Sequence, residues 1–221
     1  MSLENVIGVA GAPATGKSTL VGMCKDMCPE LEVITADNMV RDIISNPHYG
    51  VEYRWKTKFE DEGQDVRNDK GAMSIAKLTR TPDRLKEFLK MLRDPMTIKI
   101  FDALKGSNEE AKLIDWLFLP TLKDIWPGLG LSVITFADLN DQVNRYLDRE
   151  AGKGYTQEFA ENHMKTHTID YANTPCDMPV VNRSFEDLDK AARIIIRFDT
   201  AGIKRQNQGF ISLERNLIKS F

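Results

Sequence analysis

The segment at residues 11–18, Gly-Ala-Pro-Ala-Thr-Gly-Lys-Ser, constrains the fold of this chain more than any other feature, because it follows the pattern G-x-x-x-x-G-K-[S/T]. The apolar residues 6–10 directly before it predict a short buried strand of a parallel sheet. Residues 18–27 after it place apolar side chains at helical spacing, and Pro29 ends the predicted helix. A strand, a glycine-containing loop and a helix in this order predict a loop that binds phosphate groups.

Each fixed position of this loop has a physical reason. Gly11 and Gly16 allow the backbone to curl so that successive N–H groups can point at phosphate oxygens. Lys17 is expected to reach the β- and γ-phosphates and to act in catalysis, and the Ser18 hydroxyl is expected to bind the metal. The predicted cofactors are therefore ATP and Mg²⁺. The predicted nucleotide-binding residues of the loop are Gly11, Ala12, Pro13, Ala14, Thr15, Gly16, Lys17, Ser18 and Thr19.

Strand and helix patterns alternate along the rest of the chain. Residues 113–119 fit either a strand or a helix, and Pro95 is expected to interrupt a helical pattern. The alternation predicts an α/β fold with three α/β/α layers and a parallel sheet, which the phosphate loop identifies as the P-loop type. Beside this sheet we expect a helical acceptor-binding lobe and a small lid. A second buried strand is predicted at residues 31–35, and further strands at 132–136 and 180–181. Helices are predicted at residues 83–92, 96–104, 138–150, 156–167 and 185–198.

An acidic residue follows the second predicted strand. Asp37 would lie at the carboxyl end of that strand, the edge at which parallel sheets bind ligands. Its carboxylate could accept the proton of an acceptor hydroxyl, orient that hydroxyl, or hold a water of Mg²⁺. Asp37 is also well placed to cap the following helix, and the two interpretations are compatible. Arg41, one turn later, could face the same site or form a surface ion pair.

The length of 221 residues predicts a single domain spanning residues 1–221. Within it, a polar and aromatic stretch runs from about Asn46 to Gly71 and includes Tyr49 and Phe59. We interpret this stretch as part of an acceptor-binding insertion at about residues 45–105, with an ordinary surface insertion as the alternative.

Charge and hydropathy limit the partners. A net charge of −3 gives no broad attraction to nucleic acid and argues against such a partner. The partner expected for a P-loop phosphotransferase of this kind is a small, nucleotide-like acceptor. No apolar run approaches the roughly 18–20 residues of a membrane helix, and the N-terminus has no features of a signal peptide. The three cysteines, Cys24, Cys28 and Cys176, argue against a disulfide framework, and the expected location is the cytoplasm.

Several segments together resemble dephospho-coenzyme A kinases, a family of P-loop proteins similar to nucleoside monophosphate kinases. The resemblance extends from Val6 to about Ile196 and begins with the phosphate loop. The other matching segments are Ala-Asp-x-x-x-Arg at residues 36–41, Leu-Arg-Asp-Pro at 92–95, Leu-Pro-Thr-Leu at 119–122, the Gln-x-x-Arg-x-x-x-Arg pattern within 141–149, and residues 177–182.

This resemblance implies roles for individual residues. Asp37 would be the general base for the ribose 3′-hydroxyl of dephospho-CoA, in an acceptor site that includes Arg41 and Asp94. Arg145 and Arg149 would close over the ATP phosphates, with Arg149 acting in catalysis, as part of a lid at about residues 145–167. Asn182 would lie near the adenine.

The sequence also departs from the family pattern. Asp94 replaces a histidine in the acceptor region, and His163 and His167 replace an arginine and a glutamine of the lid helix. The loop is poorer in glycine and serine than is usual. These differences leave the acceptor open, with a (deoxy)nucleoside monophosphate kinase as the first alternative and a 5′-hydroxyl polynucleotide kinase as a variant. A nucleotide-binding switch or ATPase is a further alternative, in which Asp115 would be the second acid that such proteins place on an apolar strand.

Overall fold

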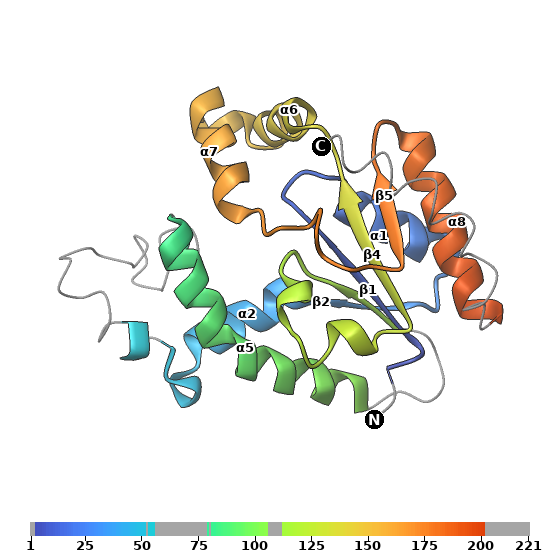
Figure 1. Cartoon of the computed structure of the whole chain (residues 1–221), viewed down its shortest axis with the longest axis horizontal. Coiled ribbons are helices and arrows are strands. Elements are labelled where there is room, and N and C mark those ends of the chain that lie inside the picture. The colour runs from blue at the N-terminus through green and yellow to red at the C-terminus, as the bar shows by residue number, and fades with distance from the viewer. Residues whose placement is uncertain (1–2, 52, 56–78, 80, 106–111, 202–221) are drawn as a thin grey trace. The chain divides into compact units, whose positions relative to one another are not determined.

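A computed structural model describes residues 3–51, 53–55, 79, 81–105 and 112–201 (Figure 1). Phe59 of the polar and aromatic stretch, residues 106–111 and residues 202–221 lie outside the described part of the chain. The chain divides into two compact units. The first combines Met1–Ile34 with Ser107–Phe221, and the second is Thr35–Gly106.

The first unit holds the sheet, and the chain leaves it directly after the second strand. Its strands are β1 (Val6–Gly11), β2 (Glu32–Thr35, whose last residue opens the second unit), β3 (Lys112–Asp115), β4 (Leu131–Phe136) and β5 (Met178–Val181). Its α-helices are α1 (Lys17–Met27), α6 (Leu139–Arg149), α7 (Gln157–His167) and α8 (Phe185–Ala201), with short 3₁₀ helices η3 (Leu119–Thr121), η4 (Trp126–Gly128) and η5 (Ala151–Lys153).

The five strands form one sheet in the order β2-β3-β1-β4-β5. β1 pairs in parallel with β3 on one side and with β4 on the other, and β4 pairs in parallel with β5. Every residue of β1 is buried, as the apolar run predicted for a central strand. The expected α/β fold with a parallel sheet is therefore confirmed, and the phosphate loop leaves its central strand at the carboxyl end.

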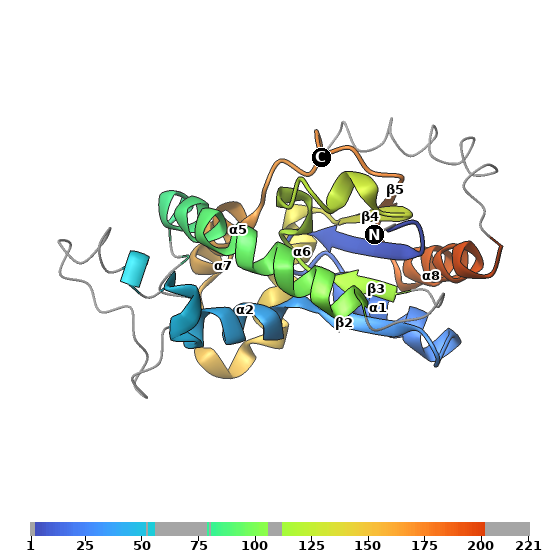
Figure 2. The ribbon, with the colours of Figure 1, turned by 90° about the horizontal axis from the view of Figure 1, so that it is seen from below.

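Two helices cover one face of this sheet. α1 and α8 pack against each other and lie on the same side of the strands (Figure 2). Apolar side chains of both helices meet those of the strands in one core, so that truncating a central member such as Leu20 would cost about 2–5 kcal/mol. The buried residues of this core include Val9, Leu20, Cys24, Cys28, Val133, Val180, Leu188, Ala191, Ala192 and Ile195, as the helical spacing of α1 and α8 predicted.

A segment with two 3₁₀ helices lies over the strand residue Gly8. A side chain there would collide with Leu119 and Leu129 and would touch Trp126. The Trp126 indole donates a hydrogen bond to the carbonyl of Pro175, 2.8 Å away. Of the ambiguous residues 113–119, only the beginning is therefore a strand, and the chain turns away after Asp115 to cover the sheet.

β2 was expected to be a buried strand, and this prediction is wrong in part. β2 is the edge strand of the sheet, and only Ile34 of its four residues is buried. Glu32 is exposed at its side chain and pairs with the buried ammonium of Lys112 at 2.9 Å. The edge position explains why this strand is less apolar than β1.

The second unit contains α2 (Ala36–Ser45), the 3₁₀ helix η1 (Pro47–Tyr49) and the long helix α5 (Pro82–Lys105). Pro95 was predicted to interrupt α5, but the helix continues through it. A proline inside a helix frees the carbonyl four residues earlier, which here is that of Met91. The Arg54 guanidinium donates a hydrogen bond to this carbonyl at 3.5 Å, which compensates in part for the lost helical bond. Across the residues that the structure describes, no helix is long and apolar enough to span a bilayer.

Candidate nucleotide-binding site

The phosphate loop connects the end of β1 to the start of α1. Gly16, the residue before the helix, has φ 95°, and a side chain there would collide with Asn182. Gly11 has φ 150° and lies against Thr135 and Thr15. Both glycines are therefore required by backbone conformation and by space. Ala14 has φ 59°, which costs a non-glycine residue about 1 kcal/mol.

Three carbonyl groups of the loop accept hydrogen bonds from side chains. The Thr15 hydroxyl donates to the carbonyl of Ala12 at 2.8 Å, and Asn182 donates to that of Thr15 at 2.9 Å. The Arg145 guanidinium donates to the carbonyl of Ala14 at 3.5 Å. The N–H of Thr15 also donates to the carbonyl of Ala12, at 3.4 Å. With these carbonyls engaged, the other N–H groups of the loop are the polar groups that could face an anion.

Lys17 forms an ion pair beside the loop. Its ammonium lies 2.9 Å from Oδ1 of Asp115, the last residue of β3, and the two side chains are only 16% and 11% exposed. β3 pairs directly with β1, so that Asp115 stands beside Val9 at the carboxyl edge of the sheet. The sequence points to Asp115 only under the switch or ATPase alternative, whereas the structure places it beside Lys17 of the phosphate loop.

The residues at this edge fit a magnesium ion. The Asp115 oxygen that pairs with Lys17 is buried and makes no hydrogen bond within the described part of the chain. The Ser18 side chain is exposed at the start of α1. No group of three or more His, Cys, Asp or Glu residues that could hold a metal occurs among the described residues. One carboxylate and one hydroxyl suit Mg²⁺, which takes most of its remaining ligands from phosphates and water.

The two predicted lid arginines differ in their surroundings. Arg145 reaches the loop at Ala14 and also donates to the carbonyl of Asn182 at 3.3 Å. Arg149 lies over the Tyr146 ring, 5.4 Å from its centroid, and donates to Glu150 at 3.1 Å, with its side chain 61% exposed. The structure therefore brings Arg145, and not Arg149, into contact with the phosphate loop.

The hairpin of α6 and α7 packs against the loop through the Ala14 side chain. A small core in these two helices consists of Val143, Tyr146, Ala160 and Met164, and Ala14 lies against it. This packing offers a reason for an alanine at a position whose backbone favours glycine. At the connection between the helices, Gly154 adopts a left-handed conformation with φ 66°, as a turn at this position requires.

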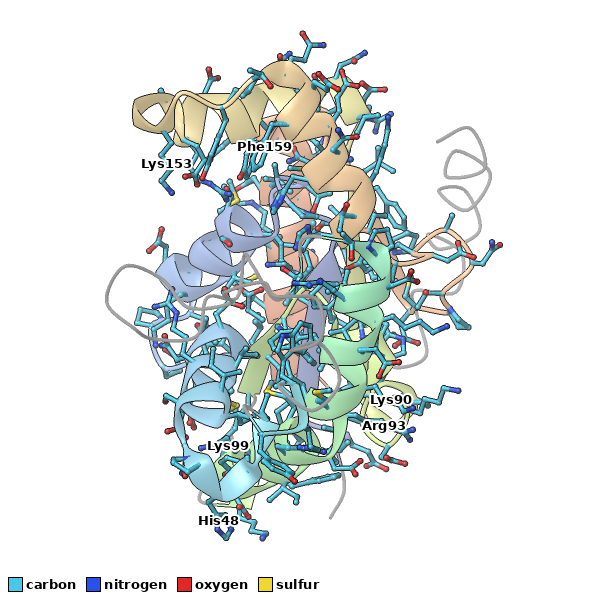
Figure 3. All side chains as sticks on the ribbon, turned by 90° about the vertical axis from the view of Figure 1, so that its left-hand side faces the viewer. His48, Lys90, Arg93, Lys99, Lys153 and Phe159 are labelled. Atoms are coloured by element: carbon cyan, nitrogen blue, oxygen red, sulfur yellow. The ribbon has the colours of Figure 1, made fainter. Side chains whose placement is uncertain are left out.

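The same hairpin carries a series of stacked rings. The Phe159 ring stacks on the Tyr155 ring, with 4.4 Å between the ring centroids. The centroid of His163 lies 4.9 Å from that of Tyr146, on which it stacks, and 4.1 Å from that of His167. Burial, and then the neighbouring His167 and Arg149, lower the pKa of His163 to about 4. Burial also lowers the pKa of His167. Figure 3 labels Phe159 and Lys153 on this hairpin.

The predicted acceptor residues belong to the second unit. Asp37 is the second residue of α2, and the N-cap position is Thr35, so that the interpretation of Asp37 as the helix cap is wrong. Asp37, Arg41 and Asp94 are all exposed. One turn along α2 from Asp37, Asp42 accepts a hydrogen bond from Lys99, whose ammonium also lies 5.7 Å from the Tyr49 ring centroid (Figure 3 labels Lys99).

Sequence comparison matched the chain to no protein-family model and to no curated protein. Solved structures resemble it at low identity. TT1252 from Thermus thermophilus is 18% identical, with a TM-score of 0.64 over 87% of this chain and 96% of that one. A dephospho-CoA kinase from Campylobacter jejuni is 13% identical, with a TM-score of 0.57 over 90% of this chain and 99% of that one.

A shikimate kinase from Acinetobacter baumannii, in complex with shikimate, is 12% identical, with a TM-score of 0.51 over 90% of this chain and 95% of that one. These likenesses extend over nearly the full length of each structure. The chain therefore has the α/β fold that is found in P-loop kinases of small molecules.

Proposed function

We propose that this protein is an ATP-dependent small-molecule kinase, which transfers the γ-phosphoryl group of ATP to a hydroxyl group of a nucleotide-like acceptor. The observation that carries the proposal is the phosphate loop itself. Its glycines, its engaged carbonyls and the pairing of Lys17 with Asp115 form a site for the phosphates of a nucleotide. The fold shared with small-molecule kinases supports a phosphotransferase.

The residues at the sheet edge would have separate roles in binding the nucleotide and its metal. Lys17 would leave Asp115 and bind the β- and γ-phosphates, where its charge stabilises the charge that develops on the transferring group. Ser18 and Asp115 would hold Mg²⁺, which supplies further neutralisation of the phosphate charge when it is bound. Arg145 is already at the loop, and Arg149, exposed one turn later on α6, could turn toward the phosphates in a closed state.

Asp37 is the proposed general base. It is exposed, it makes no ion pair or hydrogen bond among the described residues, and it lies two residues after the end of β2. An exposed carboxylate at this position can accept the proton of the attacking hydroxyl.

The acceptor that we propose is dephospho-CoA, phosphorylated at its 3′-hydroxyl. This rests on the resemblance of residues 36–41, 92–95, 119–122 and 141–149 to dephospho-CoA kinases. A (deoxy)nucleoside monophosphate is the alternative acceptor, because Asp94 changes the acceptor region from that family. The packing of the α6–α7 hairpin against the loop favours a kinase over an ATPase, since a kinase must exclude water from the γ-phosphate.

A coupled assay of ADP release from Mg-ATP tests the proposal. The panel of acceptors contains dephospho-CoA, the ribonucleoside and deoxyribonucleoside monophosphates and a 5′-hydroxyl oligonucleotide, and Lys17→Ala is the control that should abolish turnover. Turnover with dephospho-CoA alone supports the full proposal. Turnover with a monophosphate supports the kinase and replaces the acceptor. ADP release that needs no acceptor would favour the ATPase alternative.

A further inference from the structure

A buried hydroxyl on β4 contacts the phosphate loop from the side of the sheet. Thr135 is directly opposite Gly11 in the pairing of β1 with β4, and its side chain is 1% exposed. Its Oγ1 lies 2.7 Å from Oγ1 of Thr15, which is also 1% exposed, and 3.3 Å from the carbonyl of Ala10. The Thr15 hydroxyl lies in turn 2.8 Å from the carbonyl of Ala12.

Each of the two hydroxyls can donate one hydrogen bond, so the direction of the bond between them decides which of the other contacts are used. If Thr135 donates to Thr15 and Thr15 donates to Ala12, both bonds are short, at 2.7 and 2.8 Å. In the opposite direction Thr15 donates to Thr135, and Thr135 must use the longer contact of 3.3 Å to Ala10. The distances favour the first direction, in which Thr135 acts on the loop carbonyl of Ala12 through the hydroxyl of Thr15.

The loop needs such support because it holds few glycines. Between Gly11 and Gly16 the residues are Ala-Pro-Ala-Thr, and Ala14 is in a conformation that costs an alanine free energy. A curved loop of this composition keeps its N–H groups in place only if other bonds hold it. The space occupied by Thr135 also explains Gly11, since a side chain at Gly11 would collide with the Thr135 hydroxyl.

We propose that Thr135 is a positioning residue, which fixes the curvature of the phosphate loop through Thr15 and so sets its affinity for the nucleotide phosphates. The inference rests on the proposed function, because the loop must bind a nucleotide for its curvature to matter. Thr135 itself, buried beneath the loop, has no direct contact with the ligand in this account.

The test compares Thr135→Val, which removes the hydroxyl at nearly the same shape, with Thr135→Ser, which keeps it. Isothermal titration measures the Kd for Mg-ADP, and thermal unfolding without ligand measures stability. We expect Thr135→Val to raise the Kd on the order of tenfold, the value of one lost hydrogen bond of ordinary strength. Thr135→Ser should restore binding to within about twofold of the wild type.

A matched control lies on the same strand. Ser132 is buried, and its hydroxyl donates to Asp177 at 2.7 Å, away from the loop. Ser132→Ala therefore removes a comparable hydrogen bond of β4 and should lower the melting temperature without changing the Kd. If it raises the Kd as much as Thr135→Val does, the effect is one of general stability and the inference is wrong.

Thr15→Val is a second variant that tests the inference if Thr135→Val does not fold. It removes the same bond from the loop side, and a rise of the Kd similar to that expected for Thr135→Val supports the inference. An unchanged Kd in Thr15→Val or in folded Thr135→Val, beside normal binding by the wild type, overturns the inference alone. A wild-type protein that does not bind Mg-ADP overturns the proposed function together with the inference.

Discussion

The ammonium of Lys17 and the carboxylate of Asp115 lie 2.9 Å apart at the carboxyl edge of the sheet, where α1 begins and β3 ends. Without a nucleotide, each charge neutralises the other in a poorly exposed position. In the proposed function, phosphates that bind to the loop would compete for Lys17, and a metal that accompanies them would take over Asp115. The ion pair would then link the binding of nucleotide to the binding of its metal.

Asp115→Asn should separate these two events. The variant loses a ligand of the metal, so that its affinity for Mg-ATP falls, by about tenfold or more. Its affinity for ATP in the presence of a chelator should stay the same or rise, because Lys17 is released from the pair. Titration with and without Mg²⁺ measures both. Asp189→Asn, on the exposed face of α8, is the control, and an equal loss under both conditions would contradict the assignment.

Asp37→Asn should leave ATP binding near the wild-type level and lower turnover by about 10²–10⁴-fold, since it removes the proposed base without changing the phosphate loop. Kinetic assays with saturating acceptor and direct titration of the nucleotide measure the two effects. Asp42→Asn, on the same helix α2, serves as the control for the loss of a carboxylate. Wild-type turnover in Asp37→Asn would remove this residue from the mechanism.

The arginines of α6 should respond differently to replacement by alanine. Arg145→Ala removes the donor to Ala14 and Asn182, and we expect weaker binding of the nucleotide itself. Arg149→Ala removes a side chain that lies over the Tyr146 ring in this state and is proposed to reach the phosphates only on closure, so that turnover should fall more than binding. Separate measurement of Kd and kcat distinguishes them, with Arg193→Ala as control. The reverse pattern would contradict a catalytic role for Arg149.

Acid should weaken the α6–α7 hairpin. The pKa of His163 is lowered to about 4 in the folded protein, whereas an exposed histidine has a pKa of about 6.5. Between these values the unfolded chain binds a proton that the folded chain does not, so that stability is lost as the pH falls from about 6.5 toward 4. Because solvent partly screens the ring, we expect a contribution of about 1–2 kcal/mol.

His163→Phe tests this expectation, since it keeps a ring in the stack and removes the titration. Thermal unfolding at pH 7 and pH 5 should show a smaller loss of stability in the variant than in the wild type. An equal loss in both would mean that other groups cause the acid sensitivity.

The sequence alone was sufficient to predict those features that depend on neighbouring residues. The strand β1, the loop and α1 follow one another within about twenty residues, and their pattern of apolar residues and glycines predicted them correctly. The cap of α6 is equally local, because the carboxylate of Asp138 accepts a hydrogen bond from the backbone of Asn140. Each of these features depends on neighbours within one turn or one loop.

The features that the sequence did not predict depend on contacts between residues that are far apart in the chain. Asp115 became a site residue because β3 lies beside β1, and Thr135 because β4 lies on the other side, relations that no local pattern contains. Pro95 lies within α5, and the carbonyl that it frees accepts a hydrogen bond from Arg54, which is distant in the sequence. The one signal for Asp115 in the sequence was its position after the apolar residues Leu113 and Ile114. So short an apolar run before an acid also occurs by chance in many proteins.

The central claim, phosphoryl transfer from ATP, is tested most directly by following the γ-phosphoryl group itself. ATP labelled at the γ-phosphate is incubated with the protein, Mg²⁺ and dephospho-CoA, and the products are separated. We predict that the label appears on the acceptor, in an amount equal to the ADP formed, and that Lys17→Ala transfers none. Label that appears only as inorganic phosphate, with every acceptor of the panel, would contradict the account.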